Sequence, residues 1–201
     1  ASLLRPILKP ILGDRTIGDC GTPFFCMAGR MRGEVRWTGM LRQGFSERFI
    51  ASFEPVFLPP STPLIDAAAA SGSVPVLFPP ARIEHERYID TIHFASIPAR
   101  ELRQTTNVDM VIATDTNPRF PLLRSIAPRG IRTFLHRCIE AVEEECAHCG
   151  LVIKPTLEGS PWNFGRAKVY IEAGRRAAEE ALPNIRALLH TQPSVRVEDP
   201  R

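Results

Sequence analysis

Four potential metal ligands lie close together in the second half of the chain, namely Cys138, Cys146, His148 and Cys149. Two residues separate Cys146 from Cys149, a spacing that is common among zinc-ligating cysteines. Cys138 precedes Cys146 by eight residues, so a helix would place both thiols on a similar face. Zinc binding is one interpretation; thiols packed at a helix end and a redox-active pair are the others. We adopt the packing interpretation and therefore expect no metal or other cofactor.

A second set of residues has the types that serine hydrolases use, because Asp90, His93 and Ser96 lie within seven positions. Such a set often arises by chance, and no sharp nucleophile turn accompanies this one. Ser71 and Ser73 lie on either side of a glycine, which is more typical of a helix end than of a nucleophile. Asp90 by itself could also cap a turn at the end of a strand.

The composition bounds the classes of function. The 201 residues are 44% hydrophobic and 23% charged, as in an ordinary globular protein. The 25 basic and 22 acidic residues are too balanced to indicate nucleic-acid binding. An odd count of five cysteines argues against a disulfide scaffold and favours a reducing intracellular compartment, cytoplasmic or an organelle matrix. The apolar runs are too short to span a bilayer, so we expect at most peripheral membrane contact.

Strands and helices alternate along the chain, which predicts an α/β fold. Strands are predicted over 23–31, 33–39, 82–90, 109–115 and 151–155, the first two as a hairpin that turns at Arg32 and Gly33. Helices are predicted over 44–57, 63–71, 98–105, 131–148 and 164–182. Thr62 is expected to cap the second helix, with Pro63 in its first turn. Pro183 is expected to end the last helix and restart a further turn.

Two of these elements carry a more specific expectation. The run Met110-Val-Ile-Ala113 does not alternate, which predicts a central strand that is buried on both faces of a parallel sheet. The last helix should bury one apolar stripe. Its members are Tyr170, Ile171, Gly174, Ala178, Ala181 and Leu182.

Several segments resemble the patatin-like family of lipid acyl hydrolases. The stretch 66–80, DAAAASGSVPVLFPP, resembles the family's Ala-Ser-x-x-Ile-Pro-x-x-Phe-x-Pro signature. The segment Arg87-Tyr-Ile-Asp90 resembles the strand that delivers its catalytic aspartate, and Ile97-Pro98 resembles the dipeptide that follows. The resemblance implies that 1–201 is the C-terminal part of one patatin-like domain. It also implies a three-layer α/β sandwich with a largely parallel central sheet whose N-terminal strands are missing.

The same resemblance implies a serine–aspartate dyad that hydrolyses phospholipid or lysophospholipid esters, with Asp90 as the proton acceptor. The G-x-S-x-G turn of the nucleophile is absent, and the nearest string is Gly44-Phe-Ser46-Glu-Arg48. The family's glycines after the aspartate are replaced by Thr91 and Ile92, which avoid positive φ, so this loop should differ from an active one.

We therefore expect a hydrolase domain that is inactive alone, whose nucleophile lies outside this chain. Another polypeptide or an upstream segment would complete the sheet. The alternative is a non-catalytic structural or regulatory subunit of a larger assembly.

Overall fold

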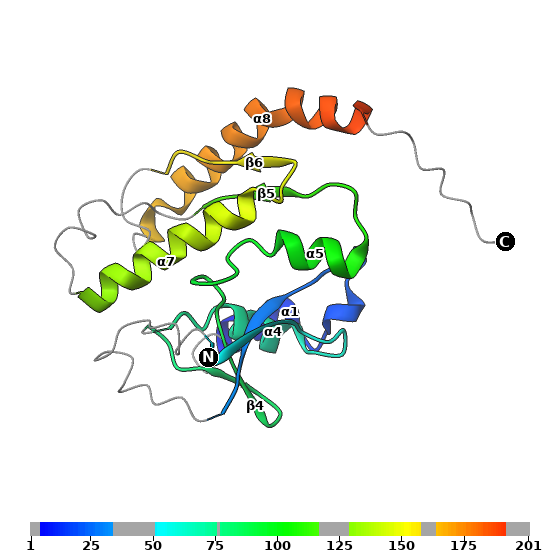
Figure 1. Ribbon diagram of the computed structural model, residues 1–201. Coiled ribbons are helices and arrows are strands. Elements are labelled where there is room, and N and C mark those ends of the chain that lie inside the picture. Colours follow the sequence, from blue (N-terminus) through cyan, green and yellow to red (C-terminus); the bar gives the residue numbers. More distant parts are fainter. Residues whose placement is uncertain (1–4, 34–50, 76, 117–128, 158–163, 192–201) are drawn as a thin grey trace. The chain divides into compact units, whose positions relative to one another are not determined.

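The computed structural model describes residues 5–33, 51–75, 77–116, 129–157 and 164–191 (Figure 1). The chain divides into two compact units. The first comprises Ala1–Pro98 and Phe120–Glu143, and the second comprises Ala99–Arg119 and Glu144–Arg201. Each unit is described by itself. The expectation that 1–201 forms part of a single domain stays a prediction.

The first unit is built on a four-stranded antiparallel sheet. Its strands are β1 (Met27–Met31), β2 (Phe53–Phe57), β3 (Ala81–Ile83) and β4 (Glu86–Ile89), in the order β2-β1-β4-β3. The strand predicted over 82–90 is confirmed as the hairpin β3–β4, and the strand predicted over 23–31 is confirmed for its second half. The strand predicted over 33–39 lies outside the described residues, apart from Gly33.

The helix predicted over 44–57 is wrong where it can be compared, because residues 53–57 form β2. Phe53, Val56 and Phe57 are residue types that favour a pleated, half-buried surface. Pairing along the whole length of β1 decides the conformation, and no helical pattern could reveal that partner. Pro55 is tolerated because β2 is an edge strand among the described residues.

One face of this sheet packs against α4 (Leu64–Ser71). Ala67, Ala69 and Ala70 of the helix are buried in one cluster with Ala28 and Tyr88 of the sheet. The predicted helix is therefore confirmed, but its N-cap is Pro63 rather than Thr62, and no side chain caps it. Two further elements precede the sheet. They are α1 (Arg5–Leu12), which forms in spite of Pro10, and the short 3-10 helix η1 (Ile17–Asp19).

The opposite face of the sheet carries a second, smaller cluster. Phe53 and Ile89 are buried there, and Phe94 and Phe134 pack against them. Phe134 belongs to α7 (Arg129–Cys146), which confirms the helix predicted over 131–148 with a small shift. A Cβ added at Gly29 would lie 2.7 Å from Cζ of Phe94, so only glycine permits this approach to β1. The sheet thus has apolar contacts on both faces.

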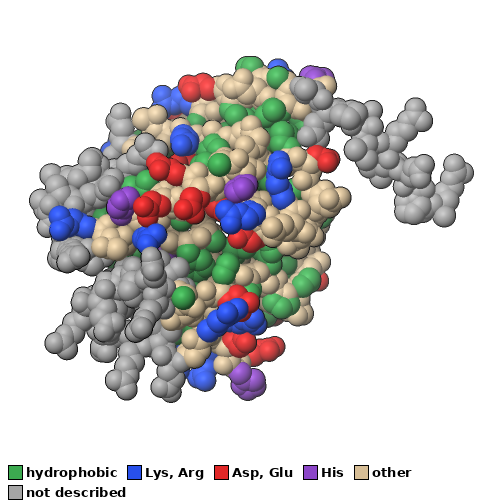
Figure 2. Space-filling view, in the orientation of Figure 1, with side chains coloured by type: hydrophobic (Ala, Val, Ile, Leu, Met, Phe, Trp, Pro, Cys, Tyr) green, Lys and Arg blue, Asp and Glu red, His purple; other side chains and the backbone are tan. Residues whose placement is uncertain are grey.

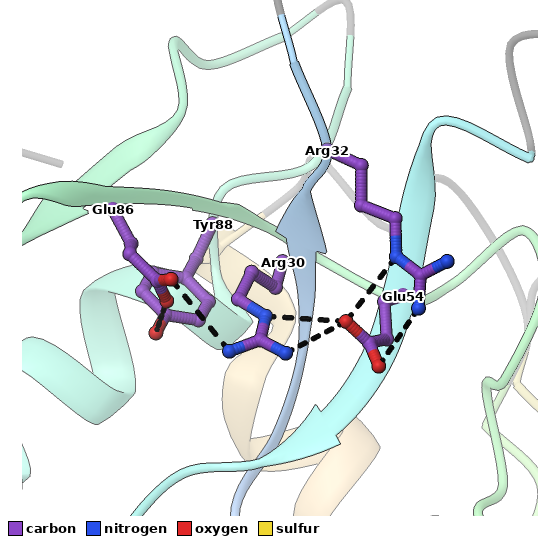
Figure 3. Close-up of polar contacts among 5 residues, drawn as sticks. All are labelled: Arg30, Arg32, Glu54, Glu86 and Tyr88. Atoms are coloured by element: carbon purple, nitrogen blue, oxygen red, sulfur yellow. Dashed lines mark hydrogen bonds and ion pairs between the residues drawn. The ribbon is translucent and has the colours of Figure 1, made fainter.

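A polar network crosses the three longest strands of the sheet, as Figure 3 shows. Arg30 on β1 lies opposite Glu54 on β2 and Tyr88 on β4. Its Nε and Nη2 donate to Oε2 of Glu54 at 3.2 and 2.7 Å, and Nε of Arg32 donates to the same oxygen at 3.3 Å. The Tyr88 hydroxyl donates to Glu86 at 2.7 Å. Hydrogen bonds from Arg32 and Arg30 lower the pKa of Glu54 to about 2, so this carboxylate stays charged and supports the strand register.

The second unit contains a two-stranded parallel sheet. Its elements are α5 (Ala99–Thr106), β5 (Ile112–Thr114), β6 (Leu151–Ile153), the 3-10 helix η2 (Phe164–Arg166) and α8 (Ala167–Thr191). β5 and β6 pair in parallel, from Ile112 opposite Leu151 to Thr114 opposite Ile153. The mixed α/β class is confirmed. The described residues do not show a largely parallel central sheet, because the larger sheet is antiparallel and parallel pairing is confined to β5 and β6.

The expectation for the strand at 109–115 is wrong in its burial. Ala113 is buried, but Ile112 is 39% exposed and Thr114 is exposed too, so β5 alternates. β6 is its single partner among the described residues. An apolar run reports hydrophobic residues but does not report how many neighbouring strands cover them.

The apolar stripe of α8 also differs from the expected one. Ala181, a member of the expected stripe, is buried, but Ile171 is 72% exposed and Leu182 is 41% exposed, and the buried Ala173 was not expected. The helix continues through Pro183 to Thr191, so this proline does not end it. The buried face of α8 is rotated relative to the expected one. A shift of one residue turns the helix by about 100°, and the face that contacts β6 is the one that is buried. None of the described helices combines the length and the apolar character that crossing a membrane requires.

Two glycines provide a matched test of this packing. We expect Gly29→Ala to lower the free energy of unfolding by about 1–3 kcal/mol, because the new Cβ collides with Phe94. Gly174 lies inside α8 with nothing within 4 Å of its added Cβ, so Gly174→Ala should stabilise the protein by about 1 kcal/mol. Urea unfolding followed by circular dichroism measures both. An equal effect of the two variants would contradict the close contact at Gly29.

Candidate functional site

Asp90 follows β4 directly and is held by two hydrogen bonds. Its backbone N–H donates to the carbonyl of Ser73 at 3.0 Å, and its Oδ1 accepts the N–H of Ile92 at 2.7 Å. Ser73 is 1% exposed, and its hydroxyl donates to the carbonyl of Ala69 at 2.7 Å. The end of α4 and the end of β4 are therefore joined. This contact brings together the serine-containing segment and the aspartate that the sequence singled out separately.

The environment of Asp90 gives its carboxyl an unusual affinity for protons. Burial raises the pKa of Asp90 to about 6, and the hydrogen bond from Ile92 acts in the opposite direction. A half-buried carboxyl with a pKa near neutrality is still ionised at pH 7 and accepts a proton more readily than an ordinary aspartate. The residue thus has the protonation behaviour that a general base requires.

The charge of Asp90 affects the pKa of two buried thiols. Burial raises the pKa of Cys26, and the Asp90 charge adds to the effect, while a hydrogen bond with Ser71 opposes it. Burial likewise raises the pKa of Cys138 to about 12, again with a contribution from Asp90. Both thiols stay protonated at neutral pH and are poor nucleophiles. The sequence analysis did not connect either cysteine with Asp90, because no sequence spacing relates α7 or the start of β1 to the end of β4.

His93 lies in a box of aromatic rings. Its ring centroid is 4.6 Å from that of Phe94, 5.9 Å from that of Phe134 and 6.1 Å from that of Phe53. Burial lowers the pKa of His93 to about 3, so the ring is neutral. Such a weak base takes a proton poorly from a serine. The structure therefore gives no support to a triad of Asp90, His93 and Ser96.

The loop after Asp90 has the backbone that its β-branched residues require. Among the described non-glycine residues only Glu84 and Asn107 adopt positive φ, so Thr91 and Ile92 do not. The carbonyl of Thr91 accepts the N–H groups of Phe94 and Ala95 at 2.9 and 2.8 Å, which closes a turn. The expectation that Thr91 and Ile92 avoid positive φ is confirmed.

The cysteine cluster of the second half makes separate contacts in the part of the chain that the structure describes. No group of three or more His, Cys, Asp or Glu side chains there could hold a metal ion. The His148 ring accepts a hydrogen bond from Nε of Arg100 at 3.3 Å, and Sγ of Cys149 donates to the carbonyl of Glu145 at 3.5 Å. Zinc binding by Cys138, Cys146, His148 and Cys149 therefore finds no support among the described residues.

The second unit also contains a cavity of about 260 Å³ between α8 and the end of β6. Lys154, Tyr170 and Arg176 are among its lining residues, and the buried Ala173 lies on its floor. Asp90 does not line it. Figure 2 shows acidic and basic side chains interspersed on the face in view, as the balanced composition predicts.

These observations define a mixed α/β protein with a carboxyl of raised pKa at the end of a strand. The comparisons place it in a family. The sequence model of the patatin-like phospholipase family matches residues 1–103, which is more than half of the chain and includes α4, β4 and Asp90. The chain belongs to the patatin-like phospholipase family and is a domain of the lipid hydrolase type. A search of curated proteins finds no match.

The burial of His93 predicts a specific acid sensitivity. The folded-state pKa is about 3 and the unfolded value is 6.5, so the unfolded chain binds more protons between these values. The contribution of His93 to stability is present above pH 6.5 and is lost as the pH falls toward 3. When the pH falls from 6.5 to 4, we expect the free energy of unfolding of the wild type to decrease by about 3 kcal/mol more than that of His93→Leu. Urea unfolding at both pH values measures the difference from the wild type. A difference that does not change with pH would contradict the burial of this ring.

Proposed function

We propose that this chain is the later part of a lipid acyl ester hydrolase of the phospholipase or lysophospholipase type, in which Asp90 is the proton acceptor of a serine–aspartate dyad. The observation that carries the proposal is the raised pKa of Asp90, about 6, at a strand end inside the matched family region. A lipid or phospholipid ester would be the substrate. The serine that attacks it would come from outside the 201 residues, because these contain no G-x-S-x-G.

The physical argument concerns the proton of the attacking serine. A serine hydroxyl becomes a useful nucleophile when a neighbouring base takes its proton. A carboxylate of pKa about 6 is a stronger base than one of the ordinary value 3.8, and it is still unprotonated at pH 7. Oδ1 of Asp90 accepts the N–H of Ile92, and in the proposed dyad the second oxygen, Oδ2, would receive the serine proton.

A second candidate function is a non-catalytic structural or regulatory subunit of a larger assembly. The observation that favours it is the sequence Asp90-Thr91-Ile92, which replaces the flexible glycines of the family's loop. Peripheral membrane contact, an intracellular reducing compartment and a polypeptide that completes the sheet belong to the proposal in either case. Among the described residues, β5 and β6 pair only with each other, so each leaves one edge for such a segment.

A hydrolysis experiment tests the proposed serine–aspartate dyad. We expect the 201-residue chain alone to hydrolyse short acyl esters at the rate of the buffer, because no activated serine is present. We also expect it to stay unlabelled by a fluorophosphonate, which reacts with activated serines. If a protein that carries both this chain and a G-x-S-x-G segment is active, Asp90→Asn should lower its kcat by at least a hundredfold. If the chain alone hydrolyses the ester and Asp90→Asn abolishes this activity, the proposal that the serine comes from outside the chain is wrong.

Asp90 can also be tested without any activity. Its folded-state pKa is raised from 3.8 to about 6, so the native state binds more protons between these values and stability falls as the pH rises through them. Asp90→Asn removes this effect, and its stability relative to the wild type should increase by about 2 kcal/mol from pH 4 to pH 7. An exposed carboxyl, Asp109→Asn, is the matched control and should show no such increase.

This stability test separates a functional carboxyl from a turn cap. A cap that only stabilises the turn would make Asp90→Asn less stable at pH 7 than the wild type, without the increase between pH 4 and 7. That result would count against Asp90 as a proton acceptor. The contributions of Asp90 and His93 have opposite signs in nearly the same pH range. Relative to the wild type, Asp90→Asn should gain stability as the pH rises, and His93→Leu should gain stability as the pH falls.

A further inference from the structure

The turn that follows α7 brings two cysteines close together in the second unit. The N–H of Cys149 donates to the carbonyl of Cys146 at 3.1 Å, and the N–H of His148 donates to the carbonyl of Glu145 at 3.0 Å. A four-residue turn of this kind holds its first and fourth Cα atoms within about 7 Å. A disulfide requires a Cα separation of roughly 4.4–6.8 Å. A turn of this kind therefore brings the backbones of Cys146 and Cys149 into the range of separation that a disulfide can bridge.

Both ends of this turn are fixed by contacts within the second unit. The Glu145 side chain is buried, accepts the N–H of Arg100 at 3.2 Å and forms an ion pair with the Arg100 guanidinium at 3.2 Å. On the other side, the N–H of Gly150 donates to the carbonyl of Val111 at 2.9 Å. A Cβ at Gly150 would lie 2.8 Å from Cγ of Met110, so the chain passes β5 closely at this point. The two thiols are held near each other with little further loss of chain entropy.

The pair differs from the buried cysteines in its access to solvent. Cys146 and Cys149 are half-buried, whereas Cys26 and Cys138 are buried. Burial raises the pKa of Cys149, the Cys146 and Glu145 charges add to the effect, and Arg103 opposes it. The thiolate of Cys149 is therefore not stabilised, so its exchange should become faster as the pH rises, and what distinguishes the pair from Cys26 and Cys138 is its access to solvent.

We propose that Cys146 and Cys149 are a reversible redox site that forms an intramolecular disulfide by exchange with a small disulfide such as oxidised glutathione. One thiolate attacks a glutathione sulfur, which releases one reduced glutathione and leaves a mixed disulfide. The second thiolate then attacks the protein sulfur of that bond and releases the second glutathione. Two electrons pass from the protein to glutathione, and two protons leave the thiols. The bond would fix the connection between α7 and β6, independently of any hydrolase activity.

The test uses the full 201-residue chain in buffers of increasing oxidised-to-reduced glutathione ratio, quenched with acid and analysed by peptide mass spectrometry. We expect the peptide with both cysteines to lose two hydrogens, more rapidly as the pH rises, while Cys26 and Cys138 stay available for alkylation after unfolding. Cys20 is half-buried like the pair and is the single-thiol comparison, which should take up one glutathione.

Two variants distinguish the site from general thiol oxidation. Cys146→Ser should convert the disulfide of the pair into a mixed disulfide of Cys149 with glutathione, whereas Cys138→Ser should leave the disulfide intact. Circular dichroism establishes that each variant folds, and the wild-type experiment stands without them. The proposal is overturned if Cys146 and Cys149 each retain a glutathione, if either pairs with a different cysteine, or if both stay reduced while Cys20 is modified. Protection of the pair by a bound metal, detected by native mass spectrometry, would overturn it as well.

Discussion

The close approach at Gly29 is the contact on which the candidate site depends. Phe94 reaches the backbone of β1 because Gly29 has no side chain, and the same ring stacks on Phe53 and meets His93 edge-to-face. Phe94 ends the short turn that begins at Thr91, directly after Asp90. A larger residue at position 29 would collide with Phe94 and so disturb the turn that follows Asp90.

The loop after β4 buries two ionisable groups of opposite charge type at a cost to the folded state. Desolvation raises the pKa of Asp90 and lowers that of His93, so each group resists the charged form that it would take in water. Among the described residues no cation lowers the pKa of the Asp90 carboxyl, and a fold under selection for stability alone has little reason to keep such a carboxyl half-buried. Perturbed pKa values cluster at functional sites, which is why we propose a catalytic role for Asp90, whereas the aromatic contacts of His93 fit a packing role.

The two units contribute differently to the argument. The unit with the antiparallel sheet contains Asp90 and most of the residues that match the family, so the function is argued from it alone. The network of Arg30, Glu54 and Tyr88 in that sheet is polar, but its groups satisfy one another, which fits a role in strand register. The unit with β5 and β6 contributes the Cys146 and Cys149 turn, whose chemistry is independent of the hydrolase.

The sequence by itself determined the local elements and the identity of Asp90 as the residue to examine. Helices such as α4 and α7 follow from periodicity and from alanine content, and the extended conformation over 82–90 follows from alternation, because these signals depend on neighbouring residues. Only the tertiary structure decided that residues 53–57 pair with β1 and that Ile112 is exposed. It also decided that the charge of Asp90 contributes to the raised pKa of Cys26 and Cys138. Those outcomes depend on contacts between segments that are distant in the chain, and a pKa depends on how much water such contacts exclude.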